Sequence, residues 1–103
     1  MTLAVVRFSL RARADLVEID RYTLRKWGLA QADRYLNALQ ARCDRLAGNP
    51  FMGRACNEIQ PGLRRIEHEE HVIFYRPHVG EIIVSRVLHR SMLAARHAMD
   101  EEL

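Results

Sequence analysis

The sequence predicts an α+β fold in which a helical hairpin packs on an antiparallel β-sheet. Two observations predict this class. Apolar residues recur at three- and four-residue steps in the first half of the chain, which is typical of helices. In the second half they alternate with polar residues, which is typical of strands. No repeat, low-complexity tract or linker interrupts the 103 residues, so we expect one domain over residues 1–103.

The N-terminal half predicts a strand followed by two helices. Residues 3–8 are apolar and partly β-branched, as in a short strand. Residues 10–27 carry one apolar stripe along a helix, which Ser9 can cap and Gly28 ends. Residues 30–47 repeat the pattern. Because so short a connection joins them, the two helices must be antiparallel neighbours.

The C-terminal half predicts a β-meander and a short last helix. Residues 48–62 hold three glycines and two prolines and are interpreted as a long loop. Three strands follow, at residues 63–68, 72–76 and 81–88. Short turns join them, so we expect antiparallel neighbours. Ser91 can then cap a final helix over residues 92–99.

The charged residues restrict the function only mildly. Sixteen basic and thirteen acidic residues give a formal charge of +3, too little to imply nucleic-acid binding without clustering on one face. Six arginines come from the predicted sheet and its loops: Arg54, Arg64, Arg65, Arg76, Arg86 and Arg90. They form either a solvated face or a surface that binds an acidic protein segment or RNA. Arg76 and Arg86 are candidates for cross-strand neighbours.

Other polar and reactive residues have ordinary structural interpretations. His68 and His71 flank a predicted tight turn without a third ligand, which favours solvated turn residues over a metal site. We expect Cys43 in the core, whereas Cys56 lies in the long loop and could be exposed. Trp27 is expected to anchor the end of its helix in the core. The sequence therefore predicts no metal, no cofactor and no disulfide framework.

The chain shows no targeting or membrane signal. Arg7 interrupts the only apolar run near the N-terminus, and no run approaches the ~18 residues of a membrane helix. We expect a cytoplasmic protein without a membrane partner.

The most informative segment is the end of the last predicted strand. An apolar run changes there to His89 and Arg90, and Met92 follows where a helix begins. Polar side chains at the end of a rigid strand are typical of binding and catalytic sites. His89 is therefore a catalyst, a binding contact or a strand cap.

Nearly the whole chain resembles the ParE branch of the RelE/ParE toxin superfamily. Each matching piece is short, but their order and spacing are specific. The matching residues are Ala14-Asp15-Leu16, Ile19, Tyr22, Trp27-Gly28, Gln31-Ala32, Tyr35, Leu39, Leu46-Ala47, Asn49-Pro50, Gly53-Arg54, Gly62-Leu63-Arg64, His71-Val72-Ile73-Phe74-Tyr75-Arg76 and Arg86-Val87-Leu88-His89-Arg90-Ser91-Met92. The family's helical hairpin on an antiparallel sheet agrees with the periodicity.

The resemblance implies a toxin of a type II toxin–antitoxin pair. Such a toxin inhibits DNA gyrase by stalling the cleaved complex, is not an enzyme, and is neutralised in a hetero-oligomer by a ParD-like antitoxin. The antitoxin carries the DNA-binding part, so no sequence-specific DNA binding is expected of this chain. One departure is that Met92-Leu93 stands where family members often have Met-Asp.

Three sets of candidate residues follow from the resemblance. Target inhibition is assigned to His89, Arg90 and Met92, because the C-terminal region is implicated in toxicity. Antitoxin binding is assigned to Trp27, Arg54, Tyr75, Arg76 and Arg86. The alternative is a ribosome-dependent mRNA endonuclease of the RelE type, whose acid, base and cation would be drawn from Glu58, Arg65 and His89.

Overall fold

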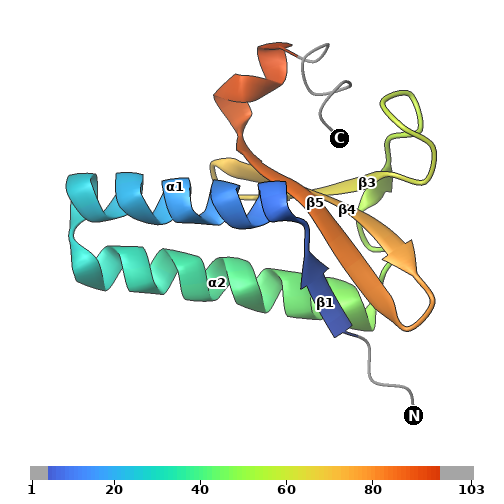
Figure 1. Ribbon diagram of the computed structural model, residues 1–103, viewed down its shortest axis with the longest axis horizontal. Coiled ribbons are helices and arrows are strands. Elements are labelled where there is room, and N and C mark those ends of the chain that lie inside the picture. The colour runs from blue at the N-terminus through green and yellow to red at the C-terminus, as the bar shows by residue number, and fades with distance from the viewer. Residues whose placement is uncertain (1–4, 96–103) are drawn as a thin grey trace.

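Two long helices lie across one face of a five-stranded sheet in the computed structural model, which describes residues 5–95 (Figure 1). The elements in order are β1 (Val5–Phe8), α1 (Leu10–Trp27), α2 (Leu29–Gly48), β2 (Arg54–Ala55), β3 (Arg64–His68), β4 (His71–His78), β5 (Glu81–His89) and the 3₁₀ helix η1 (Arg90–Ala95). The predicted α+β class, with a helical hairpin on a mostly antiparallel sheet, is confirmed.

The helical hairpin has the predicted signals at both ends of α1. The Ser9 hydroxyl accepts a hydrogen bond from the Ala12 amide at 3.0 Å and so caps the helix. Gly28 separates the two helices at φ 91°, a conformation that favours glycine. The predicted burial of Trp27 is wrong, because its side chain is 63% exposed. The hairpin extends past the edge of the sheet at that end (Figure 1), so no element within residues 5–95 covers the indole.

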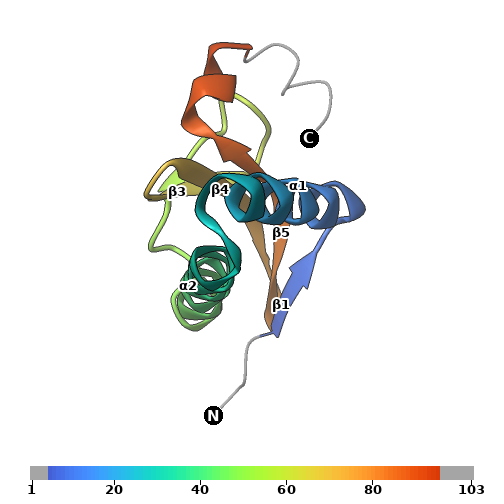
Figure 2. The same ribbon diagram turned by 90° about the vertical axis from the view of Figure 1, so that its left-hand side faces the viewer.

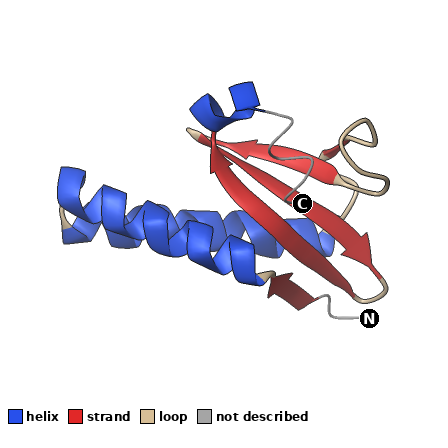
Figure 3. Cartoon of the chain, turned by 45° about the horizontal axis from the view of Figure 1, so that its top comes forward, coloured by secondary structure: helices blue, strands red, loops and turns tan. Residues whose placement is uncertain are grey.

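The sheet has the strand order β1-β5-β4-β3-β2, in which β3, β4 and β5 form the predicted meander. β1 instead runs parallel to β5 at the other side of the meander. Both helices lie on the same side of this sheet (Figures 2 and 3). β4 continues through Pro77, beyond its predicted end. β3 stops opposite Tyr75, so Pro77 lies along a free edge, where a missing amide hydrogen is tolerated.

A shift of register in β5 changes which side chains are neighbours. Tyr75 pairs with Val84 but Phe74 pairs with Arg86, so Ser85 is an extra residue, as in a β-bulge. Arg76 pairs with Ile83. The predicted pairing of Arg76 with Arg86 is therefore wrong.

Apolar residues are buried on both faces of the sheet. The larger cluster lies between sheet and helices and includes Cys43 and Tyr75. The smaller cluster lies on the opposite face, where the 49–63 loop and η1 cover Val72, Phe74 and Leu88. Cys56 belongs to this second cluster and is 1% exposed, which answers the question that the sequence left open.

The last helix begins earlier than predicted. η1 starts at Arg90 rather than Met92, and residues 96–99 of the predicted helix lie outside the described part of the chain, as do residues 3 and 4 of the first strand. None of the helices over residues 5–95 is long and apolar enough to cross a membrane.

Candidate functional site

The C-terminal half of β5 pairs with β4 on one side and contacts α1, in place of β1, on the other. β1 pairs with β5 only as far as Val84. Beyond that point the Asp15 carboxylate accepts hydrogen bonds from Arg86 Nε at 2.9 Å, Arg86 Nη2 at 3.0 Å and the Val87 amide at 2.9 Å. The two charged side chains are only 13% and 11% exposed. This pair fixes the strand end that carries His89.

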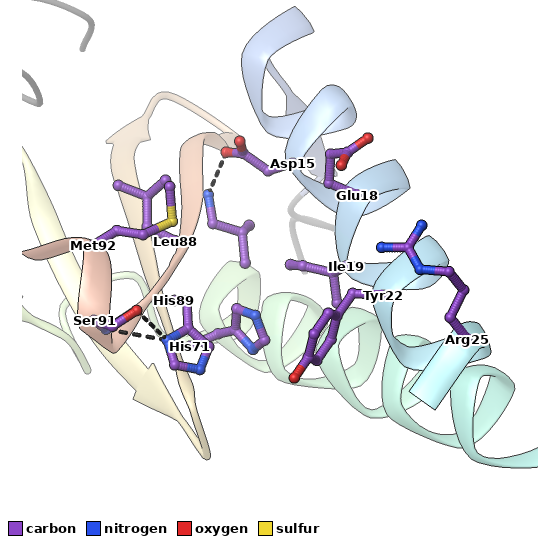
Figure 4. A pocket seen from close by; sticks show the side chains of 11 residues that line it. Asp15, Glu18, Ile19, Tyr22, Arg25, His71, Leu88, His89, Ser91 and Met92 are labelled. Carbon is purple, nitrogen blue, oxygen red and sulfur yellow. Dashed lines mark hydrogen bonds between the residues drawn. The ribbon is translucent and has the colours of Figure 1, made fainter. Parts of the chain in front are cut away.

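A groove of about 540 Å³ opens between α1 and this strand end (Figure 4). α1 contributes Ile19, Tyr22 and Arg25, and the opposite wall contains His71, His89 and Met92. Tyr22 and Met92 are both about half exposed at its rim. Apolar walls with a few polar groups are typical of binding sites.

The His89 ring joins the end of β5 to the first turn of η1. Its Nδ1 accepts a hydrogen bond from the Ser91 amide at 3.1 Å and lies 2.9 Å from Ser91 Oγ (Figure 4). Because an amide can only donate, Nδ1 carries the lone pair, and the neutral ring has its proton on Nε2. His89 therefore caps η1 and has one ring N–H left as a donor.

Three histidines form a row across the ends of neighbouring strands, which sequence reasoning missed. His68 pairs with His71, and His71 pairs with His89. The rings of His71 and His89 meet edge to face with centroids 5.4 Å apart, and the Tyr35 hydroxyl lies 2.6 Å from His71 Nδ1. The prediction of solvated turn residues is wrong, since the His68 side chain is 14% exposed. The short turn between β3 and β4 was the sequence feature that could have predicted this row, because it places His68 and His71 opposite each other.

Burial sets the charge of His71, the middle histidine of this row. Burial is the main cause that lowers the pKa of His71 to about 4, with smaller contributions from the neighbouring His89 and His68, so His71 is neutral near pH 7. Burial likewise raises the pKa of Tyr35 to about 12. Within residues 5–95 no group of three or more His, Cys, Asp or Glu is arranged to hold a metal ion.

The structure does not bring together the residues of the alternative endonuclease site. Arg65 bonds to Glu67 at 3.0 Å and lies over the ring of Phe74, which belongs to the cluster on the face away from the helices. His89 lies on the helix side, in the groove. Glu58 lies in the loop that covers the face of Phe74. The sheet therefore separates both Glu58 and Arg65 from His89.

The candidate antitoxin contacts divide into exposed and buried residues. Trp27 and Arg54 are exposed. Tyr75 is fully buried, and its hydroxyl bonds to the Pro50 carbonyl at 2.7 Å and the Gly53 amide at 2.9 Å. Tyr75 and the buried Arg86 therefore stabilise the fold, and their assignment as surface contacts is wrong.

Arg76 and the target-inhibition residues remain partly accessible. Arg76 donates to Ser85 Oγ at 3.2 Å and also bonds to Gln60. Arg90 donates to the Glu69 carbonyl at 2.7 Å, and Met92 is 51% exposed. His89, Arg90 and Met92 thus lie together where β5 continues into η1.

Nearly all of the described residues match a known family model. The family model for the ParE toxin of type II toxin–antitoxin systems, parDE, matches residues 6–94. The chain belongs to this family.

Relatives of this ParE-family toxin are similar over most of their length. Toxin ParE1 of Mycobacterium tuberculosis is 49% identical over 82 residues, which are 79% of this chain and 84% of the relative. Toxin ParE1 of Caulobacter vibrioides is 43% identical over 91 residues, 88% of this chain and 94% of the relative. Toxin ParE of Escherichia coli is 40% identical over 82 residues, 79% of this chain and 80% of the relative.

Solved structures show the same fold at lower identity. A chain of the chromosomal ParDE system of P. aeruginosa has a TM-score of 0.72 at 19% identity, covering 84% of this toxin and 96% of that chain. A chain of the RelBE2 toxin–antitoxin complex of M. tuberculosis has a TM-score of 0.67 at 22% identity, covering 88% and 95%.

Proposed function

We propose that this ParE-family toxin arrests growth by poisoning DNA gyrase in the cytoplasm and is neutralised by a cognate ParD-like antitoxin. The observation that carries the proposal is the family match over residues 6–94, which includes the strand end at His89, Arg90 and Met92. That strand end is rigidly held by Asp15 and borders the groove, as a contact surface for a large target requires.

The toxin acts by binding rather than by catalysis. Cleavage of RNA through the 2′-hydroxyl needs a base, an acid and cations around one phosphate. The lone pair of His89 Nδ1 is already used by the Ser91 amide, and Arg65 lies on the other face of the sheet. Both facts support a non-catalytic role for His89.

The antitoxin forms a hetero-oligomer with the toxin through exposed apolar and basic residues. Trp27 and Arg54 are the exposed members of the predicted set. An amphipathic, partly acidic segment that orders on binding suits such a surface. Coexpression with the antitoxin should yield a tight, soluble complex.

The test combines induction in cells with gyrase assays in vitro. Induced alone, the toxin should cause filamentation and a DNA-damage response, and the purified protein should accumulate cleaved gyrase–DNA complexes. Deletion from Met92 onward should abolish both effects, provided that the truncated chain still folds and binds its antitoxin.

Two substitutions of His89 separate capping from catalysis. In His89→Gln the new side chain can still accept a hydrogen bond from the Ser91 amide but cannot transfer a proton near neutral pH, so most of the toxicity should remain. His89→Ala loses the cap and should be weaker. A folded His89→Gln protein without any activity, together with cleavage of ribosome-bound mRNA by the wild type, would establish the endonuclease instead.

A further inference from the structure

The groove between α1 and the end of β5 has apolar walls and opens to solvent (Figure 4). Its volume of about 540 Å³ lies within the range of about 300–1,000 Å³ that is typical of ligand pockets. The walls contain Ile19 of α1 and Leu88 of β5. Tyr22 and Met92 are 52% and 51% exposed at the rim, although large apolar and aromatic side chains are normally buried. Exposed apolar area of this kind is typical of an interaction surface.

The two acidic side chains that line the groove already have basic partners within the protein. The Asp15 carboxylate accepts hydrogen bonds from Arg86 and from the Val87 amide. Glu18 Oε1 lies 3.4 Å from Arg21 Nη1, one turn further along α1. A ligand with a basic group would therefore have to compete with one of these partners.

The basic and donor groups of the groove, by contrast, are available to a ligand. Arg25 is exposed, and its guanidinium makes no hydrogen bond or ion pair with any of residues 5–95. Within the same residues the Nε2–H of the neutral His89 ring has no acceptor, because only Nδ1 is bonded to Ser91. A carboxylate complements both groups, since charge-assisted hydrogen bonds are roughly twice as strong as neutral ones.

The groove joins two residues of α1 to the residues assigned to target inhibition. Tyr22 and Arg25 lie on one face of α1, because residues three apart in a helix are neighbours. The Lys26 ammonium lies 5.7 Å from the centre of the Tyr22 ring, and this cation–π contact restricts the ring. His89 and Met92 stand on the opposite wall. The groove therefore extends the surface at the end of β5 as far as α1.

We infer that the groove binds a segment of the target protein in which a large apolar side chain stands next to an acidic one. This inference rests on the proposed function, which names the target. The apolar side chain would lie between Ile19 and Leu88, and the carboxylate would pair with Arg25. A second acceptor of the segment would bond to His89 Nε2–H. The apolar walls favour a protein, because a nucleic acid is bound mainly through its phosphates and sugars.

The experiment compares two variants of the groove with two matched variants elsewhere on α1. Arg25→Glu and Arg21→Glu each reverse one exposed arginine, but only Arg25 lines the groove. Tyr22→Ala and Val17→Ala each truncate a side chain that is 52% exposed, but only Tyr22 lines the groove. The toxin concentration that gives half-maximal DNA cleavage by purified gyrase is measured for each variant. Thermal unfolding shows that each variant folds.

The two groove variants should be weaker poisons of gyrase. Arg25→Glu should raise the half-maximal toxin concentration at least about tenfold, because it places a carboxylate opposite the acidic residue of the target. Its effect should be larger at low salt than at high salt, since exposed charges are screened. Tyr22→Ala should raise that concentration at least about fivefold, as expected when an aromatic contact is lost. Arg21→Glu and Val17→Ala should act like the wild type.

Four results would overturn the inference. Folded groove variants that poison gyrase as well as their matched variants would exclude the groove from the target contact. Normal poisoning with weaker antitoxin binding in titration calorimetry would assign the groove to the antitoxin. Normal poisoning with weaker binding of Arg25→Glu to an oligonucleotide would make the groove a nucleic-acid site. If the wild-type toxin does not poison gyrase at all, the proposed function itself fails, and this inference with it.

Discussion

Asp15 should be one of the most important residues for stability, although it is polar. Its carboxylate accepts three hydrogen bonds, two from Arg86 and one from the Val87 amide. Asp15→Ala would leave the Arg86 guanidinium, 11% exposed, without this carboxylate and would also remove the acceptor of the Val87 amide. Alanine favours helices, so any loss of stability comes from the lost contacts.

The expected loss follows from the burial of the pair. Removing one partner of a buried ion pair costs about 3–5 kcal/mol, and the remaining access to water places Asp15→Ala near 3 kcal/mol. A domain of this size is stable by about 5–15 kcal/mol in total, so a large share would be lost. Urea unfolding followed by circular dichroism measures the change. Glu18→Ala is the matched control one turn along α1, since its pair with Arg21 is exposed and is worth about 0.5 kcal/mol or less.

A double substitution separates the loss of the hydrogen bonds from the effect of the Arg86 charge that remains. Asp15→Leu combined with Arg86→Met removes both charges and replaces them with apolar side chains, so it should be less destabilising than Asp15→Leu alone. If Asp15→Ala costs less than about 1 kcal/mol, or the double variant is no better than the single one, the pair does not hold β5 and the reasoning fails.

Three further predictions concern other parts of the fold. A Cβ at Gly53 would lie 2.6 Å from both the Arg65 carbonyl oxygen and the Tyr75 hydroxyl, so Gly53→Ala should cost about 1–3 kcal/mol in urea unfolding; wild-type stability would contradict this crowding. The pKa of His71 is about 4 in the folded protein and ~6.5 in the unfolded chain. The free energy of unfolding should therefore be constant above pH 6.5 and should decrease as the pH falls toward 4. A His71→Gln variant with the same dependence on pH would exclude this cause. Burial raises the pKa of the Cys56 thiol, so iodoacetamide should modify it, as measured by mass spectrometry, only after unfolding; fast labelling of the native protein would show that the loop opens.

Local patterns predicted the elements of this fold well because each depends on neighbours in sequence. The Ser9 cap, Gly28 between the helices and the alternation in the meander all act over a few residues. Burial of single residues was harder to predict. Whether Trp27 is covered depends on where the sheet ends, and the apolar stripe of α1 contains no information about that.

The candidate site was only partly predictable, since its contacts join distant residues. The end of β5 was found from its change of composition, and the structure places His89, Arg90 and Met92 there together. Asp15 and Arg86 are 71 residues apart in sequence, so their pairing could not be read from spacing. The histidine row depends on the register of three strands, which was predicted only in outline.

The geometry of α1 connects stability, toxicity and neutralisation. Near its N-terminal end Asp15 holds the strand end that carries the candidate target-inhibition residues, whereas its C-terminal end projects past the edge of the sheet (Figure 1). Substitution of Asp15 should therefore reduce stability and toxicity together, because the end of β5 loses its contact with α1. Substitution of Trp27 should change only neutralisation, because that ring is 63% exposed and no other element in the described part of the chain covers it. Two substitutions on the same helix should therefore have different effects: replacing Asp15 should reduce stability and toxicity, whereas replacing Trp27 should reduce only neutralisation by the antitoxin.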